Sequence, residues 1–119
     1  KIAIMIPDYE SIMLPFLKKL SDGNEHKFRD LIEELAEEFN LSAEEKKELL
    51  PSGTSPIFDN RVGWARTYLK KAGLIEAPKR GISVITEKGI EVLKQNPKKI
   101  DVAFLKKFPA FVEFLNSRP

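Results

Sequence analysis

The chain has 119 residues, which is enough for one domain with a single hydrophobic core. Its 42% hydrophobic and 32% charged residues exclude an intrinsically disordered chain, and its apolar stretches are far shorter than the roughly 20 residues of a membrane span, so no membrane partner is expected. The net charge is only +2, and the absence of cysteine excludes disulfides and thiolate chemistry, from which we expect a cytoplasmic protein.

The first half of the chain predicts three helices. Residues 9–20 carry apolar side chains at four-residue spacing, which is typical of one helical stripe. Residues 28–39 have the cleanest amphipathic pattern of the chain, and their polar face is largely glutamate. Ser42 and Glu45 form a capping-box signature, which predicts a short third helix that ends at residues 49–51.

The next segment predicts a helix followed by a hairpin. Asp59 or Asn60 is expected to cap a fourth helix, which stops at Gly73. Residues 74–77 and 82–85 are short and rich in β-branched side chains, so they predict two strands joined by a basic turn. A hairpin alone is only marginally stable, so it must pack on the helices, and the side chains expected to do so are Leu74, Ile82 and Val84.

The remainder of the chain predicts further helices. Thr86 is expected to cap one that halts at residues 96–97, and residues 102–115 form a last helical region. We therefore expect a winged-helix domain over residues 1–96. Residues 97–119 form a C-terminal helical extension, which either packs on the domain or projects from it.

The order of these elements predicts the fold class. A mainly α chain with a small β-hairpin, in which three helices precede the hairpin, is a winged helix-turn-helix. In that arrangement the helix before the hairpin normally enters the major groove of DNA, and the hairpin lies along the backbone.

Charge is distributed unevenly along the chain. Residues 22–50 contain ten acidic and four basic residues, a net charge of −6, whereas residues 59–99 contain ten basic and four acidic residues, a net charge of +6. This division has two interpretations: two solvated faces that happen to differ, or a surface built to meet a polyanion.

The predicted helix over residues 60–72 has a face suited to close contact with a duplex. Its inward positions at 100° per residue are Val62, Ala65, Leu69 and Ala72. Small and polar residues with cations beside them occupy the other positions, where asparagine can pair with adenine and arginine or lysine can reach guanine or phosphate. With the basic turn, the predicted DNA-binding residues are Asn60, Arg61, Gly63, Trp64, Arg66, Thr67, Lys70, Lys71, Lys79 and Arg80.

Each of these residues also has a plainer interpretation. Trp64 is four residues from Tyr68, and the two rings suit packing against another helix as well as contact with DNA. Gly63 suits either the close approach of a partner or a neighbouring aromatic ring. Lys70 and Lys71 are favourable near a helix C-terminus for the helix dipole alone.

Catalytic chemistry is not predicted. The glutamates of residues 33–48 lie on the outer faces of predicted helices, His26 has no nearby nucleophile or second metal ligand, and no Gly-rich phosphate loop is present. We expect no catalytic residues, no cofactor and no metal, and therefore no enzymatic activity of this domain.

The segment PIFDNRVGWARTYLKKAGLIEAPKRGISVITEKGIEVL (residues 56–93) resembles the amino-terminal domain of Mrr-type restriction system proteins. In that family an Asn-Arg-x-Gly-Trp-Ala helix is followed by Leu-Lys-x-Ala-Gly-Leu, a turn with Arg-Gly and a Thr-x-x-Gly helix start. YESIMLPFLKKLSDG (residues 9–23) is similar to the opening helix, so the resemblance covers most of residues 8–96. The family residues carried over are Asn60, Arg61, Gly63, Trp64, Ala65, Arg80 and Gly81.

This resemblance implies a winged-helix DNA-binding module of a type IV, modification-dependent restriction endonuclease. In the parent proteins the module directs a separate nuclease domain toward foreign, often methylated, DNA. The chain departs from them because it has no Asp…(Glu/Gln)-x-Lys nuclease pattern on consecutive strands. We expect the targeting half of such a protein, with double-stranded DNA, methylated or not, as its partner. It is either cut from a longer parent chain that carries the nuclease domain or acts alone.

Two other functions remain open. One is a protein-interaction or dimerisation winged helix, in which the surface for a docking partner or for a homodimer is formed by Trp64, Tyr68, Phe104, Phe108, Phe111 and Phe114. The other is a stand-alone transcriptional regulator of the same fold.

Overall fold

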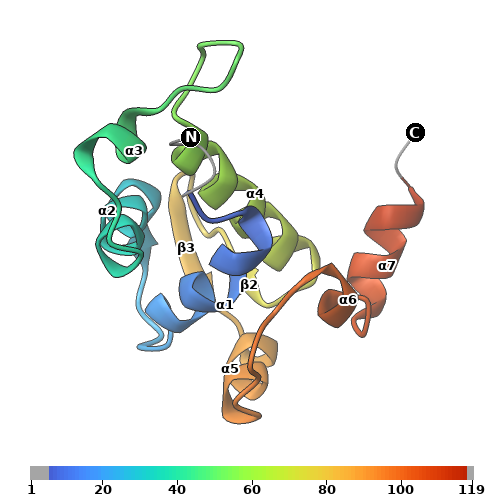
Figure 1. The fold of residues 1–119 in the computed structure, drawn as a ribbon. Helices are drawn as coiled ribbons and strands as arrows, with labels where there is room; N and C mark the ends of the chain where they lie inside the picture. Colours follow the sequence, from blue (N-terminus) through green and yellow to red (C-terminus); the bar gives the residue numbers. More distant parts are fainter. Residues whose placement is uncertain (1–5, 118–119) are drawn as a thin grey trace.

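The computed structural model describes residues 6–117, so the first five and last two residues of the predicted domain and extension lie outside the described residues. Within that range the chain forms seven helices and three short strands (Figure 1). In chain order they are α1 (Tyr9–Lys19), β1 (His26–Lys27), α2 (Phe28–Glu38), α3 (Ala43–Lys47), α4 (Ile57–Lys71), β2 (Ile75–Glu76), β3 (Ile82–Ile85), α5 (Glu87–Lys94), α6 (Val102–Leu105) and α7 (Pro109–Asn116).

The fold is mainly helical with a small antiparallel sheet, which confirms the predicted fold class and is consistent with a winged helix. Strands β2 and β3 form the predicted hairpin, with Ile75 opposite Ile85. The sheet has a third strand that the sequence did not predict, because β1 pairs with β3 through His26 opposite Ser83 and gives the strand order β1-β3-β2. A strand of two residues is too short to show a period-2 pattern, which explains the omission.

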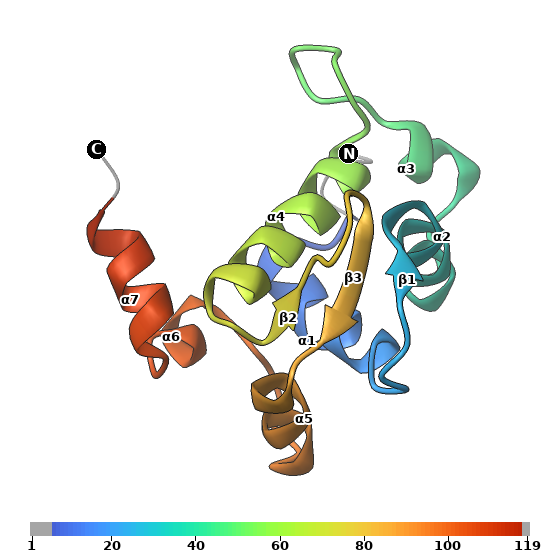
Figure 2. The ribbon, with the colours of Figure 1, turned by 180° about the vertical axis from the view of Figure 1, so that it is seen from behind.

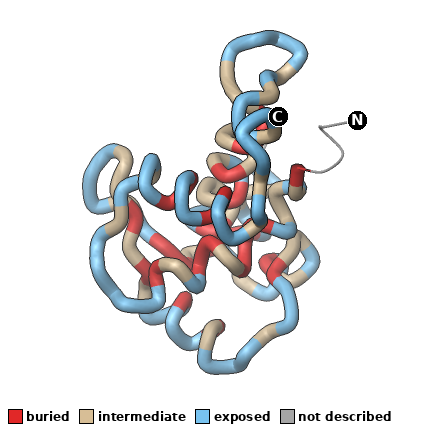
Figure 3. Tube along the Cα trace, turned by 60° about the vertical axis from the view of Figure 1, so that its left-hand side comes forward, coloured by how far each residue is buried: buried red, intermediate tan, exposed pale blue. Residues whose placement is uncertain are grey.

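The core lies where α1 and α4 pack against each other beneath the sheet. The inward face of α4 is the predicted one, since Val62, Ala65, Leu69 and Ala72 are all fully buried. Figure 3 shows the buried residues gathered in the interior, while the loop between α3 and α4 is largely exposed. Burial of these aliphatic side chains against α1 fixes which side of α4 is left for a partner.

The start of α4 differs from the expectation. Pro56, not Asp59 or Asn60, is the N-cap residue, and Asn60 already donates its backbone N–H to the Pro56 carbonyl at 3.1 Å. The helix begins earlier because the preceding loop is closed on itself: Ile57 N–H donates to the Glu48 carbonyl at 2.7 Å. The same closure ends α3 at Lys47, before the predicted residues 49–51, although its Ser42–Glu45 capping box is present as predicted.

The end of α4 agrees with the prediction. Gly73 has φ +84°, a left-handed conformation that glycine adopts without steric cost. Its N–H donates to the Lys70 carbonyl and that of Leu74 donates to the Leu69 carbonyl, both at 3.0 Å, which is the Schellman pattern. The hairpin therefore leaves α4 in a fixed direction.

The hairpin packs on the helices through a different set of side chains from the predicted one. Leu74 is buried as expected, but on β3 the inward residues are Ser83 and Ile85, whereas Ile82 and Val84 lie on the other face and are half-buried. The serine hydroxyl is satisfied by a side chain of α4, which is why a polar residue can occupy the inward position.

Helix α5 is attached closely to the hairpin. The Thr86 hydroxyl accepts the Gly89 N–H at 3.2 Å, as the predicted cap, and donates to the Gly73 carbonyl at 2.6 Å. A Cβ added at Gly89 would clash with the Leu74 carbonyl oxygen and lie 2.6 Å from Cγ1 of Ile85. The Thr-x-x-Gly sequence is therefore explained by packing.

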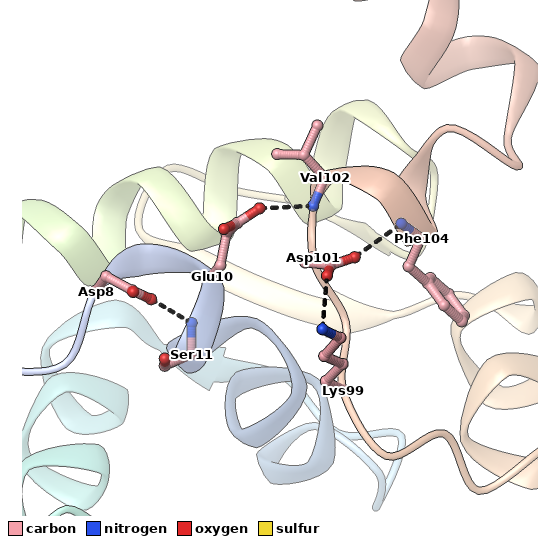
Figure 4. A network of polar contacts seen from close by, with 7 residues as sticks. All are labelled: Asp8, Glu10, Ser11, Lys99, Asp101, Val102 and Phe104. Atoms are coloured by element: carbon pink, nitrogen blue, oxygen red, sulfur yellow. Dashed lines mark hydrogen bonds and ion pairs between the residues drawn. The ribbon is translucent and has the colours of Figure 1, made fainter.

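The C-terminal extension packs back on the domain. The carboxylate of Glu10 on α1 accepts the backbone N–H of Val102 at 2.9 Å, and Asp101 caps α6 by accepting the Phe104 N–H at 2.9 Å (Figure 4). That hydrogen bond, with the Lys99 ammonium 3.5 Å away, holds the pKa of Asp101 below its ordinary value of 3.8. Further along, α7 buries Phe111 against α4, and Phe104, Phe108 and Phe114 are half-buried.

Candidate nucleic-acid interface

One side of α4 is left uncovered by the core. Asn60, Gly63, Thr67 and Lys70 lie opposite the buried stripe, and we refer to these four residues as the outward face of α4. Lys70 is exposed and the other three are partly exposed. Because α4 begins at Ile57, the Asn60 side chain is not needed as a cap, and it has no hydrogen bond to any other residue that the structure describes.

Helix α7 lies beside the C-terminal end of α4 (Figure 2). The Tyr68 ring packs edge-on against Phe111 and Phe114, with ring centroids 5.5 and 5.9 Å apart. The ammonium of Lys71 lies 5.2 Å from the centroid of Phe114, yet Lys71 remains exposed. Tyr68 thus serves packing, whereas Trp64 contacts the Tyr68 ring edge-on and is 49% exposed.

The strands and the start of α2 lie along one edge of the outward face of α4. Here the Arg66 Nε donates to the Ser83 hydroxyl at 3.3 Å, and its guanidinium carbon lies 5.5 Å from the centroid of the Phe28 ring. Nearby, the Asp59 carboxylate pairs with Arg29 at 3.2 Å. Phe28 and Ser83 could not be predicted as site residues, because the hydrophobic pattern marks them only as a helix start and a strand residue.

The turn between β2 and β3 carries the other two predicted cations. Lys79 and Arg80, which we call the wing tip, are both exposed. The Lys79 ammonium is 4.0 Å from Glu25, but both side chains are solvated, and such a pair contributes little. Both charges therefore remain available to a partner.

Arg61 is placed differently from the other predicted cations. Its Nη1 donates to the backbone carbonyls of Ile6 at 2.9 Å and Pro7 at 3.3 Å, on the side of α4 that faces the start of α1. The structure therefore brings together the outward face, Arg66, Lys71 and the wing tip, and separates Arg61 from them.

Gly63 is the position where the two interpretations of the sequence differ most. A Cβ built on Gly63 would meet only the tip of the Phe28 ring, at 3.8 Å, which is ordinary van der Waals contact. Its backbone is helical, so neither conformation nor packing within the domain requires glycine. The Phe28 ring is the neighbouring aromatic ring of the second interpretation, but it leaves room for a methyl group at Gly63.

The acidic residues form no metal site within residues 6–117, where no group of three or more His, Asp or Glu side chains could hold an ion. The Asp22 carboxylate accepts a hydrogen bond from Nε2 of His26 at 2.8 Å, and this contact is the main cause that lowers the pKa of Asp22. None of the helices in that range is long and apolar enough to cross a membrane.

Comparison with known proteins identifies the family. A family model of the Mrr N-terminal domain matches residues 9–95, which run from α1 to the end of α5. The chain belongs to the Mrr N-terminal domain family. This Mrr N-terminal domain is similar to the type IV methyl-directed restriction enzyme EcoKMrr of Escherichia coli (strain K12), with 30% identity over 93 residues.

The match covers 77% of this chain but only 30% of that relative's length. The match thus leaves most of the relative's length outside the aligned region. No solved structure matches the chain. The resemblance deduced from residues 56–93 is thus confirmed at the level of the domain.

Proposed function

We propose that this Mrr N-terminal domain binds duplex DNA, with α4 in the major groove and the wing tip on the phosphate backbone. The observation that carries the proposal is the outward face of α4, which is polar, free of the core and accompanied by exposed cations on both of its edges. Short polar side chains such as Asn60 and Thr67 suit base edges, whereas lysine and arginine at the periphery suit phosphates.

We further propose that the domain supplies binding and no catalysis, and that in a longer protein it directs a nuclease domain to its target. The relative is named as a methyl-directed restriction enzyme, which makes methylated DNA the first substrate to try. The outward face carries no carboxylate, histidine or cysteine, which agrees with a targeting role.

The half-exposed indole of Trp64 favours a second candidate, a protein-interaction surface. Against it, Phe111 is fully buried and the other aromatic side chains of the extension pack toward Tyr68 and each other. Much of the aromatic surface that this alternative needs is therefore used inside the domain.

A mobility-shift assay of the 119-residue chain with methylated and unmethylated forms of the same duplexes tests the proposal. We expect binding to duplex DNA, and Asn60→Ala or Thr67→Ala should cost about 1–3 kcal/mol on the preferred duplex only. Since neither residue belongs to the core, the melting temperature should hardly change. If both variants fold and bind every duplex as the unmodified chain does, α4 does not read bases.

A further inference from the structure

Ser83 is an unusual residue in this core. It is fully buried on the inward face of β3, and it is the sole polar side chain found buried among residues 6–117. A buried hydroxyl without a partner is costly, and here the partner is the Nε of Arg66 on α4, 3.3 Å away. The residue therefore links the middle strand of the sheet to the edge of the candidate interface.

Arg66 is held at two points by this arrangement. Its Nε–H is used by Ser83, and the guanidinium lies over the Phe28 ring at 5.5 Å, a favourable cation–π distance. A guanidinium has five N–H donors, so the four on Nη1 and Nη2 remain, and they have no hydrogen bond or ion pair to any residue that the structure describes. The acid nearest in the sequence, Asp59, is paired with Arg29 instead.

Three segments of the chain meet around Arg66, namely β1, the start of α2 and the turn between β2 and β3. Phe28 opens α2, and its backbone N–H donates to the Gly81 carbonyl at 2.8 Å, which joins the start of α2 to the end of the wing turn. Lys27 and Arg29, on either side of Phe28, are both exposed, and Lys27 pairs with Ile82 in the sheet. The Arg66 fork is thus fixed between α4 and the wing turn, near the exposed Lys27 and near Arg29, which is paired with Asp59.

We infer that Arg66 is a preorganised phosphate-binding residue, and that Ser83 and Phe28 are positioning residues that hold its guanidinium for a backbone phosphate of duplex DNA. This inference rests on the proposed function. A phosphate rather than a base is the ligand because Arg66 lies on the edge of α4 beside the sheet and not on the outward face, and because a guanidinium fork matches two phosphate oxygens. Fixing the side chain before binding reduces the rotamer entropy lost on contact.

The test is a double-mutant cycle on duplex affinity, measured by fluorescence anisotropy at several salt concentrations with the 119-residue chain. Arg66→Ala should weaken binding to all duplexes equally and reduce the log–log salt slope by about 0.9, the value for one phosphate. Ser83→Ala should weaken binding about two- to fivefold, the worth of one hydrogen bond, and leave the slope almost unchanged. In the Arg66→Ala background it should have no further effect.

Two controls separate positioning from a merely structural role. Lys94→Ala removes one exposed charge at the end of α5 and should leave the slope unaltered. If Ser83→Ala strongly lowers the melting temperature, Phe28→Leu takes the place of Ser83→Ala in the double-mutant cycle. Leucine keeps an apolar contact at this position but removes the ring beneath the Arg66 guanidinium. The positioning role is overturned if Ser83→Ala and Phe28→Leu each reduce affinity as much in the Arg66→Ala background as they do when Arg66 is present.

The inference and the proposed function fail in different ways. If Lys79→Ala/Arg80→Ala flattens the salt slope and Arg66→Ala does not, the domain binds DNA but Arg66 is not a phosphate contact. If the unmodified chain binds no duplex, both are wrong.

Discussion

Replacing Gly63 by alanine should make the domain more stable and its DNA binding weaker. Glycine inside a helix costs about 1 kcal/mol relative to alanine, and α4 continues on both sides of Gly63. The added methyl group would lie 3.8 Å from the Phe28 ring, so no clash offsets the gain. We expect the free energy of unfolding to rise by about 1 kcal/mol and the melting temperature by about 4 °C.

Binding should change in the opposite direction, because the same methyl group enlarges the outward face, which the proposed function places closest to the duplex. Thermal unfolding followed by circular dichroism and anisotropy with one duplex measure the two effects on the same sample. Gly73→Ala is the matched control: Gly73 has φ +84°, so alanine there should lower stability. A loss of stability in Gly63→Ala refutes the packing argument, and a gain in stability with unchanged affinity refutes the argument that a partner requires the glycine.

Three further predictions concern other parts of the domain. Gly89→Ala should destabilise the domain by about 1–3 kcal/mol or more in denaturant unfolding, because its Cβ has no room beside Leu74 and Ile85; a neutral effect would mean that α5 moves freely against the hairpin. Lys79→Ala/Arg80→Ala should weaken binding to all duplexes about equally and flatten the salt slope by up to about 2, and an effect confined to one sequence would instead make the wing tip a reader of bases. Asp101→Asn should be less stable than the unmodified chain at pH values above 3.8, the ordinary pKa of aspartate. The difference in stability should disappear as the pH falls through the lowered pKa of folded Asp101, because the carboxyl group is then protonated. Melting curves between about pH 6 and pH 2 check this, and a difference that persists in acid would refute it.

Local patterns predicted much of the fold. The apolar positions of α4 and the glycine that ends it are properties of single helices, so Val62, Leu69 and Gly73 could be assigned before any tertiary contact was known. The hairpin followed from two β-branched runs around a basic turn. These features depend on neighbours within one or two turns of the chain.

The features that were missed depend on residues far apart in the sequence. The start of α4 is set by the Glu48–Ile57 hydrogen bond across a loop, and β1 forms because β3 offers it an edge. On β3 the hydrophobic pattern favoured Ile82 and Val84 as the inward residues, since it could not show that Arg66 would satisfy the hydroxyl of Ser83.

The candidate site was predicted as a set of residues but not as an arrangement. All eight of the predicted residues on α4 lie on that helix in the structure, yet Arg61 turns to the backbone of Ile6 and Arg66 is joined to the sheet. Helical periodicity gives the direction in which a Cα–Cβ bond points, whereas a long arginine side chain ends wherever acceptors are found. The position of α7 beside Tyr68 was likewise beyond a local pattern.

The salt dependence of duplex binding by the unmodified chain tests the central claim most directly. The candidate interface has five cations, Lys70 on the outward face of α4 and Arg66, Lys71, Lys79 and Arg80 beside it. Contact of four or five of them with phosphates predicts a log–log slope of about −4. A slope near that value, measured with anisotropy between low and physiological salt, is the result that duplex binding through this surface requires. A slope near zero, or no binding at low salt, would contradict it and favour a protein partner for the same surface.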